Sequence, residues 1–400
     1  MQVLVLTVSG DDQPGVTAGL TKVLSPFGVT IKQLEQIVLQ GHLVLGLVVA
    51  GSEKLLRTCE TAAIEYARSR NMTATSRYVT DSELEQWRER LVVTVLGSPL
   101  VPDSIAAITS EIARQGGNID RIRQVAMYPV TAIEFEVGGI EKSELRDKLT
   151  AIARANSIDI AVQEANLDRR GVHLVVMDVD STFIQEEVIE LLAAHAGVEV
   201  DVAEITQRAM NGELDFEQSL RARVAMLAGL PSSVLDNVQS EITLTPGAAT
   251  LSRTLHRLGF QVALVSGGFL EVVKPLADRL GVTNVRGNQL EIIDGKLTGG
   301  LIGPIIDRAA KAEALRYFAD HYDIPMSRTI AIGDGANDLD MLNAAALGIA
   351  FNAKPYVRDA AYASVNTPYL DTVLYVMGIT REQIERSDAH DSIDYRKPPV

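Results

Sequence analysis

The feature that most constrains the fold is an apolar strand, Gly171–Met177, that ends in two carboxylates, Asp178 and Asp180. Residues two apart share a face of a strand, and beyond its carboxyl end both carboxylates are able to converge on one point. Open α/β sheets bind their ligands at this edge. Two carboxylates so close repel each other unless a proton or cation lies between them, and a hard ion such as Mg²⁺ prefers oxygen ligands. Taken alone, the pair also fits two solvated acids at a strand end.

A second apolar strand, Val262–Val265, runs directly into Ser266, Gly267 and Gly268, and we expect a helix over Leu270–Leu280. Backbone N–H groups in such a loop are able to bind an anion, and the serine hydroxyl adds a donor. Two glycines after a strand are also common in an ordinary turn. At this point both interpretations, a phosphate-binding loop and a plain turn, stay open.

A third apolar strand, Thr329–Ile332, leads into a loop that carries Asp334 and Asp338 in the string Gly-Asp-Gly-x-Asn-Asp. The glycines permit a tight turn, so both acids are able to face the crevice at the strand ends. Between the second and third strands, Lys311 lies in a helix expected over Asp307–His321. A lone helical lysine is normally solvated, so its interpretation depends on the other motifs.

The order of these motifs, Asp-x-Asp-x-Thr, strand–Ser-Gly, Lys and Gly-Asp-Gly-x-Asn-Asp, resembles the haloacid dehalogenase (HAD) superfamily of phosphotransferases. The resemblance covers residues 171 to about 390. It implies an α/β fold whose core is a doubly wound parallel sheet, built from residues 171–183 and 246–390. It also implies a metal-dependent phosphoryl-transfer site at the strand ends.

The resemblance gives each motif residue an expected role. Asp178 would attack phosphorus and form an aspartyl-phosphate, and Asp180 would protonate the departing oxygen and then deprotonate the hydrolytic water. Mg²⁺ would be bound by Asp178, the backbone carbonyl of Asp180, and Asp334. Asp338 would orient these ligands or Lys311. The groups expected to hold the phosphoryl oxygens are Ser266, the Gly267 N–H, Lys311 and Asn337.

Between the first two motifs, residues 184–245 show helical periodicity. A helical insertion at this place would cover the strand ends as a lid, and the matching insertion in the superfamily is a small helical cap. Four side chains in it match the pattern of phosphoserine phosphatases: Glu187, Met210, Phe216 and Arg223. By this resemblance Glu187 would bind the substrate ammonium, Arg223 its carboxylate, and the other two would line the pocket. Without it, the charged pair fits solvated helix positions and the apolar pair fits the interior of the cap.

The amino-terminal half is an internal repeat. Leu4–Gly10 aligns with Leu91–Gly97, and the match continues with one inserted residue. Two units result, residues 1–80 and 90–165, each with the order strand, helix, strand, strand, helix, strand, which is the ferredoxin-like pattern. We call them the first and second repeat, and we expect the charged segment Asp81–Arg88, which holds the only tryptophan, to connect them.

The first repeat carries a loop that resembles the Asp-x-Pro-Gly loop of ACT domains, which are small regulatory modules that often bind amino acids. Its residues are Gly10, Asp11, Asp12, Gln13, Pro14 and Gly15. Proline and glycine open a helix there, and its unpaired N–H groups are able to take a carboxylate. An ordinary capped helix start is the open alternative. The second repeat lacks this string, so its own ligand binding is in doubt.

Composition and charge argue against some classes of binding partner. The chain has 37 Lys and Arg against 52 Asp and Glu, a net charge of −15, which argues against nonspecific binding to nucleic acid or anionic membranes. One cysteine, Cys59, allows no internal disulfide. The first residues lack a basic leader, and no apolar run approaches about 18 residues. We therefore expect a cytoplasmic protein.

These resemblances imply a Mg²⁺-dependent enzyme that hydrolyses O-phospho-L-serine to serine, with serine as a regulator at the ACT units, and we expect a homodimer formed through residues 1–165. Sheet edges pair readily with another chain, which favours that dimer. Two alternatives stay open: a HAD phosphatase or phosphotransferase acting on another small ester, and a non-catalytic amino-acid-sensing regulator. For the charged segment Arg386–Val400 we expect poor order.

Overall fold

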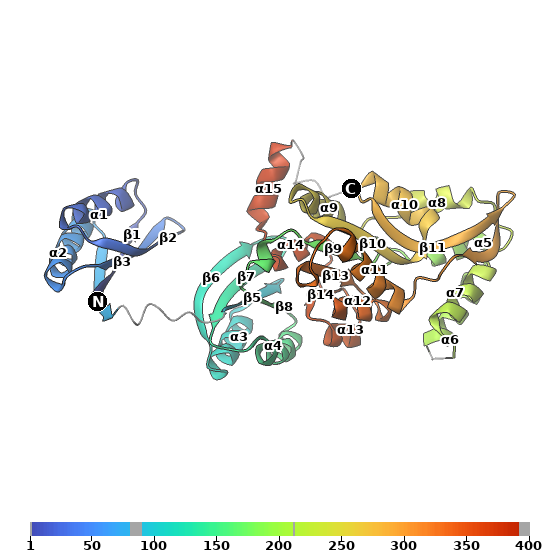
Figure 1. Cartoon of the computed structure of the whole chain (residues 1–400), viewed down its shortest axis with the longest axis horizontal. Coiled ribbons are helices and arrows are strands. Elements are labelled where there is room, and N and C mark those ends of the chain that lie inside the picture. Colours follow the sequence, from blue (N-terminus) through green and yellow to red (C-terminus); the bar gives the residue numbers. More distant parts are fainter. Residues whose placement is uncertain (1, 81–89, 211–212, 392–400) are drawn as a thin grey trace. The chain divides into compact units, whose positions relative to one another are not determined.

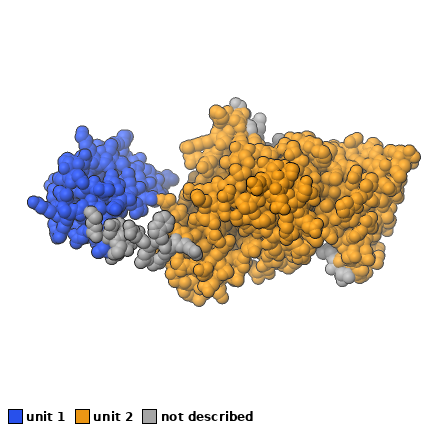
Figure 2. Space-filling model, in the orientation of Figure 1, with its two compact units in different colours: residues 1–88 blue, residues 89–400 orange. Residues whose placement is uncertain are grey.

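The computed structural model describes residues 2–80, 90–210 and 213–391, although the side chain of Met210 lies outside this description. The chain forms two compact units, residues 1–88 and 89–400 (Figure 2). The predicted connection Asp81–Arg88 falls outside the described residues. None of the helices in the described ranges is both long and apolar enough to cross a lipid bilayer.

The first repeat is a four-stranded antiparallel sheet with two helices on one face, so its expected order of elements is confirmed (Figure 1). The spatial order of the strands is β2-β3-β1-β4. Alternate apolar side chains of β1 and β3 pack under the helices, and Cys59 is buried among them. The elements are β1 (Gln2–Asp11), α1 (Val16–Leu24), β2 (Thr30–Leu39), β3 (His42–Ala50), α2 (Glu53–Ser69) and β4 (Thr73–Thr80).

The second repeat has the same order of elements, but its sheet continues into the rest of the second unit. The single sheet of that unit has 11 strands in the order β12-β11-β10-β9-β13-β14-β15-β8-β5-β7-β6. The repeat contributes β5 (Arg90–Gly97), α3 (Pro102–Arg114), β6 (Asn118–Ala126), β7 (Thr131–Gly138), α4 (Lys142–Asn156) and β8 (Asp159–Glu164). Strand β8 joins the sheet through an antiparallel pairing of Ala161 with Ala363 of β15 (Ala363–Val365).

The core is a parallel sheet with helices on both faces, as the sequence predicts (Figure 1). Its central strands are β10 (Gln261–Phe269), β9 (Leu174–Met177), β13 (Thr329–Gly333) and β14 (Leu347–Phe351), all paired in parallel. The helices are α9 (Ala248–Arg257), α10 (Leu270–Arg279), α11 (Arg308–His321), α12 (Leu339–Ala344), α13 (Pro355–Ala360), α14 (Val373–Val376) and α15 (Arg381–His390).

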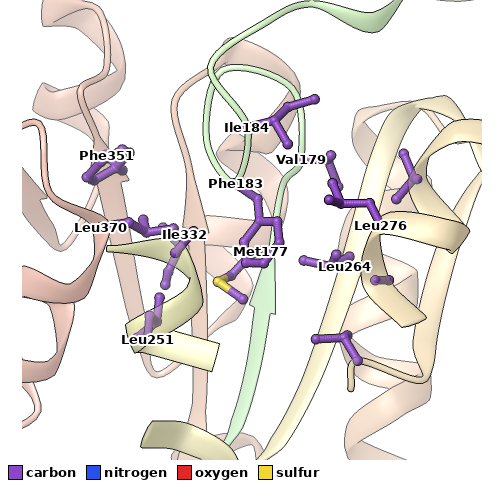
Figure 3. Close-up of a cluster of buried hydrophobic side chains, with 14 of the residues drawn as sticks. Met177, Val179, Phe183, Ile184, Leu251, Leu264, Leu276, Ile332, Phe351 and Leu370 are labelled. Carbon is purple, nitrogen blue, oxygen red and sulfur yellow. The ribbon is translucent and has the colours of Figure 1, made fainter. Parts of the chain in front are cut away.

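Strand β9 is buried on both faces, because its alternate side chains enter two different apolar clusters. Val175 and Met177 pack in one cluster, and Leu174 and Val176 pack in the other. Figure 3 shows Met177 between side chains of the neighbouring strands. A strand covered on both sides carries no polar alternation, which is why this run is continuously apolar.

The described part of residues 184–245 contains four helices: α5 (Val188–Ala196), α6 (Glu199–Met210), α7 (Phe216–Ala225) and α8 (Val234–Glu241). The chain enters and leaves this region along two adjacent segments. Ile184 forms a bridge with Leu244, and Gln185 N donates to Thr243 O at 3.0 Å. This two-stranded neck ties the helical region to the core, and residues 229–232 form a second attachment. Gly229 N donates to Leu297 O at 2.8 Å, and Leu297 N donates to Leu230 O at 2.9 Å.

Two features were missed or wrong in the sequence analysis. A hairpin of β11 (Asn284–Ile293) and β12 (Lys296–Ile302) extends the sheet; its signal was the turn Asp294-Gly295, whose φ values of 51° and 72° suit a two-residue hairpin. The expectation of poor order from Arg386 onward is wrong for residues 386–390, which lie in α15. Asp388 there is only 2% exposed and accepts hydrogen bonds from Arg253 and Arg257 of α9.

Candidate active site

Three adjacent parallel strands bring the sequence motifs to one edge of the sheet. Met177 of β9 pairs with Leu264 of β10 and with Ile332 of β13. The residues that follow each strand therefore emerge side by side. The Asp178 N–H still belongs to this sheet, since it donates to Ile332 O at 2.9 Å.

An acidic cluster forms where β9 and β13 end. Carboxylate oxygens of Asp178, Asp334 and Asp338 all lie within 4.8 Å of one another. Burial and the charge of Asp338 raise the pKa of Asp178 well above its usual range, and the same two causes raise the pKa of Asp334 to about 6. Thr182 Oγ1 donates to Asp334 Oδ1 at 3.0 Å. An all-oxygen donor set held together against this repulsion is suited to a hard divalent cation.

Lys311 is the positive charge inside this cluster. Its ammonium lies 2.6 Å from Asp178 Oδ1 and 2.7 Å from Asp338 Oδ1, and the side chain is 1% exposed. Burial alone would lower the pKa of Lys311, but the negative charges of Asp178 and Asp338 raise it above its usual value. A lysine held in this way stays charged and keeps the nearest carboxylate oxygen in a fixed place.

The Asp180 carboxylate points to a different side of the site. It accepts hydrogen bonds from Ser266 Oγ and from Val188 N, both at 3.2 Å, so its side chain is not part of the acidic cluster. Burial and the charge of Glu187 raise the pKa of Asp180 to about 7. A carboxyl with a pKa near neutrality is suited to both giving and taking a proton.

Two hydrogen bonds fix the Ser266–Gly268 segment, at the end of β10 where its pairing with β11 is interrupted. Ser266 Oγ accepts from Gly268 N at 2.7 Å, and Asn288 Nδ2 donates to Gly267 O at 2.8 Å. A Cβ at Gly268 would lie 2.6 Å from Asp180 Oδ2, so this close approach requires glycine. Asn288, 1% exposed and on β11, was missed by the sequence analysis because that strand was not predicted.

The helical region brings three of its four predicted residues over the strand ends. Glu187 accepts a hydrogen bond from Ser181 Oγ at 2.7 Å and acts electrostatically on Asp180. Burial lowers the pKa of Arg223, and the charges of Glu187, Glu190 and Asp180 act in the opposite direction. The ring of Phe216 reaches the Ser266–Gly268 segment of β10, since its Cζ would lie 3.2 Å from a Cβ at Gly267. Glu190 was not predicted, and only the packing shows its proximity to the guanidinium.

Comparison with known proteins agrees with this geometry. The sequence profile of haloacid dehalogenase-like hydrolases matches residues 175–343, and two ACT-domain profiles match residues 2–74 and 90–163. A phosphoserine phosphatase from Streptomyces coelicolor is 53% identical over 386 residues, 96% of this chain and 94% of that protein. The chain belongs to the phosphoserine phosphatase family of the HAD superfamily.

Two more relatives support membership of this family. A phosphoserine phosphatase from Mycobacterium tuberculosis is 46% identical and covers 97% of this chain and 96% of its own length. The crystal structure of a probable phosphoserine phosphatase from Vibrio cholerae matches with a TM-score of 0.58 at 34% identity, over 74% of this chain and 88% of that one. The resemblance drawn from the motifs is thereby confirmed.

The remaining predicted residues lie less directly in the site. Asn337 shares the loop of the acidic cluster, where its side chain folds over Gly335, and Asp338 Oδ2 accepts from Gly335 N at 3.0 Å. Met210 ends α6, but its side chain is outside the described part of the chain.

The ACT-like loop of the first repeat lies between β1 and α1 and is largely exposed. Asp12 N donates to Gly41 O at 2.8 Å, and Gln13 Nε2 donates to Arg70 O at 3.3 Å. Gly15 precedes α1 with φ of 86°, a left-handed conformation that favours glycine. Two hydrogen bonds and one glycine thus set the loop's shape.

Proposed function

We propose that the protein hydrolyses O-phospho-L-serine to serine and phosphate. The observation that carries this proposal is the placement of Glu187 and Arg223 beside Asp180, with the Asp178–Lys311 pair in the same site. A carboxylate and a guanidinium suit the ammonium and carboxylate of an amino acid. The relatives named phosphoserine phosphatase support the same substrate.

In this proposal Asp178 attacks phosphorus and forms an aspartyl-phosphate, so that one difficult step becomes two easier ones. Asp180, with its raised pKa, gives its proton to the serine oxygen and then takes one from the hydrolytic water. The hydrogen bond from Ser266 holds the Asp180 carboxyl in reach of that oxygen. A non-catalytic sensor would need neither a buried nucleophile nor its lysine partner.

The acidic cluster consists of three aspartates, so its side chains offer carboxylate oxygens. Mg²⁺ prefers oxygen ligands, and the cluster therefore fits this ion. Asp178, Asp334 and the backbone carbonyl of Asp180 would hold the ion, and Asp338 would orient Asp178 through Lys311. When bound, Mg²⁺ would neutralise charge between the attacking carboxylate and the phosphoryl group. The groups that would hold the other phosphoryl oxygens are Ser266, Gly267 N–H, Lys311 and Asn337.

The proposal also includes the domain boundaries, the regulation by serine and the dimer. Residues 171–183 and 246–390 form the core and residues 184–245 the cap, in which Phe216 and Met210 line the substrate pocket. The reaction would end serine biosynthesis in the cytoplasm. Serine would bind at Gly10, Asp11, Asp12, Gln13, Pro14 and Gly15 and act as a feedback regulator. A homodimer through the repeats is supported by β2, where Ile37 is 50% exposed at the edge of the sheet.

The proposal is tested by turnover of a substrate panel with Mg²⁺: phosphoserine, phosphothreonine, phosphoglycolate and homoserine phosphate. Phosphoserine should be preferred, and Asp178→Asn should lose turnover by roughly 10³-fold or more with its fold intact. Asp180→Asn should accumulate the aspartyl-phosphate. Equal turnover of phosphoglycolate, which has no ammonium, would contradict the substrate assignment.

Arg223→Ala gives a sharper test of specificity. It should reduce phosphoserine turnover by about one to two decades, since a charge-assisted hydrogen bond is worth roughly 1.5–3 kcal/mol. Turnover of an aryl phosphate, which has no carboxylate to bind, should change much less. Equal losses on both substrates would assign Arg223 a structural role in the cap instead.

A further inference from the structure

Asp159 joins the second repeat to the core through its side chain. It is the first residue of β8 and is 4% exposed. Its carboxylate accepts three hydrogen bonds from β15 and the residue that follows it: from Asn366 N at 2.7 Å, from Asn366 Nδ2, and from Ser364 Oγ at 3.1 Å. Backbone pairing here is short, with one partnered residue pair, so these three bonds fix this end of a junction that apolar packing of Val125 and Ala126 on the core also holds.

The ACT-like fold itself does not require an aspartate at this position. Its counterpart in the first repeat is Thr73, since Thr73 pairs with Ser9 on β1 as Asp159 pairs with Leu96 on β5. In the sequence repeat, Ser9 and Leu96 are equivalent. Thr73 is exposed at the edge strand β4 of a sheet that ends there. The acid therefore belongs to the junction with the core and not to the repeated unit.

The core segment that Asp159 holds ends at the neck of the cap. Four residues after Asn366, Leu370 N donates to Pro246 O at 2.7 Å. In the same segment the buried hydroxyls of Thr367 and Thr372 lie 3.1 Å apart. Leu370 is fully buried, and Figure 3 places it beside Ile332 in the apolar cluster of the core. We call residues 364–372 the strap.

Pro246 and Gly247 are the point at which the chain returns from the cap region to α9. Thr245 N donates to Phe183 O at 3.0 Å, which holds the returning segment beside the outgoing one. Gly247 has φ of 87°, and a Cβ there would lie 2.7 Å from Asp371 N of the strap. A strap packed this closely cannot shift without moving the neck.

We propose that Asp159 is a positioning residue: through the strap it sets the neck, one of the two attachments of the cap to the core, and so links the placement of the second repeat to cap closure. The link to turnover rests on the proposed function. A change in the neck alters turnover only if the cap closes over its substrate in each catalytic cycle. The link from Asp159 to the neck rests on the hydrogen bonds alone.

The test is hydrogen–deuterium exchange in the full-length protein, combined with turnover. Asp159→Thr, which installs the residue of the first repeat, should speed exchange in peptides covering 243–250 and 364–372 by about tenfold, equivalent to about 1.4 kcal/mol of local opening. Phosphoserine turnover should fall by a similar factor, and aryl phosphate turnover by less. Thr73→Ala is the matched control and should change neither measurement.

A conservative variant separates positioning from general destabilisation. In Asp159→Asn, Asn366 N still has an acceptor, and the turned Asn366 amide accepts from the new side chain, so exchange should stay much slower than in Asp159→Thr. If Asp159→Thr fails to fold, Asn366→Ala, which removes one bond, replaces it with a smaller expected effect. Unchanged exchange at 243–250 in Asp159→Thr, or in Asn366→Ala if it is used instead, would overturn the proposal. Faster exchange with unchanged turnover would overturn only its link to catalysis, and exchange remains readable even if phosphoserine is not the substrate.

Discussion

The two repeats are the same fold used in two different ways. In the first repeat, Ile37 and Val38 of β2 are 50% and 42% exposed. Their counterparts in the second repeat, Val125 and Ala126 of β6, are each 3% exposed and belong to the apolar cluster of the core. The opposite edge differs as well, since β4 ends its sheet whereas β8 continues into the core. One pattern of strands and helices thus gives a compact unit with its own sheet and a part of the larger sheet of the core.

The difference teaches that sequence repetition does not imply equal roles. Both repeats bury their own interior beneath two helices, which is what the shared pattern specifies. The second repeat also packs outer side chains against the core and pairs its edge strand β8 with β15. The first keeps an exposed apolar edge and the Pro14-Gly15 loop, which suits it to a ligand or a second chain.

Deletion should show the largest contrast. A fragment of residues 89–400 should fold and turn over phosphoserine, whereas residues 166–400 should melt roughly 10 °C lower or more, since about 2–4 °C corresponds to each kcal/mol in a domain of this size. The shorter fragment uncovers β15 and the apolar cluster that Val125 completes. Differential scanning calorimetry measures the melting temperatures of the two fragments, and a turnover assay with phosphoserine measures their activity. Equal melting temperatures would mean that the second repeat is as separable as the first.

Matched lysine substitutions sharpen the contrast at one position. Val125→Lys should destabilise the protein by roughly 3 kcal/mol or more, because a charge would enter a buried apolar site. Ile37→Lys, at the equivalent exposed position, should leave the unfolding free energy nearly unchanged but dissociate the proposed homodimer. Urea denaturation and sedimentation measure the two effects. A stable dimer in Ile37→Lys would place the dimer contact elsewhere.

The anchoring of α15, which contacts β6, should depend on pH. Burial would raise the pKa of Asp388, but hydrogen bonds from Arg253 and Arg257 outweigh it, and the pKa is lowered. The ionised form therefore stabilises the fold fully above the unfolded pKa of about 3.9, and this contribution is lost as pH falls through the lower folded value.

Asp388→Asn should accordingly cost roughly 2 kcal/mol at pH 7, and the difference from the unmodified protein should shrink below about pH 4. Thermal unfolding at several pH values measures this, with Glu382→Gln, which removes an exposed carboxylate of α15 paired with Arg386, as the control. A difference that stays constant down to pH 3 would show that packing of α15, and not the Asp388 charge, holds it against the core.

The smallest expected effect concerns the loop that only the first repeat carries. Gly15→Ala should cost about 1 kcal/mol in that unit, since φ of 86° strains an alanine. It should also weaken the response of turnover to serine while leaving turnover without serine unchanged. Serine inhibition that is equally strong in Gly15→Ala and in residues 89–400 would show serine competing at the active site, not acting through the loop.

Much of the site could be predicted because its residues are local to strand ends. Asp178, Ser266 and Asp334 each follow a continuously apolar run, and parallel strands buried on both faces must end at one edge. The repeat likewise carried its own pattern of alternation and turns. Those features depend on neighbours within a few residues, so the printed sequence contains them.

Contacts between segments far apart in the chain were decided only by the tertiary structure. Asp159 meets Asn366 across about two hundred residues, and Asn288 supports Gly267 from a strand whose role depends on its partner. The sequence alone predicts that each repeat folds, because each buries its own apolar face. It does not predict that β8 pairs with β15, because an edge strand carries the same alternation whether it faces water or another strand.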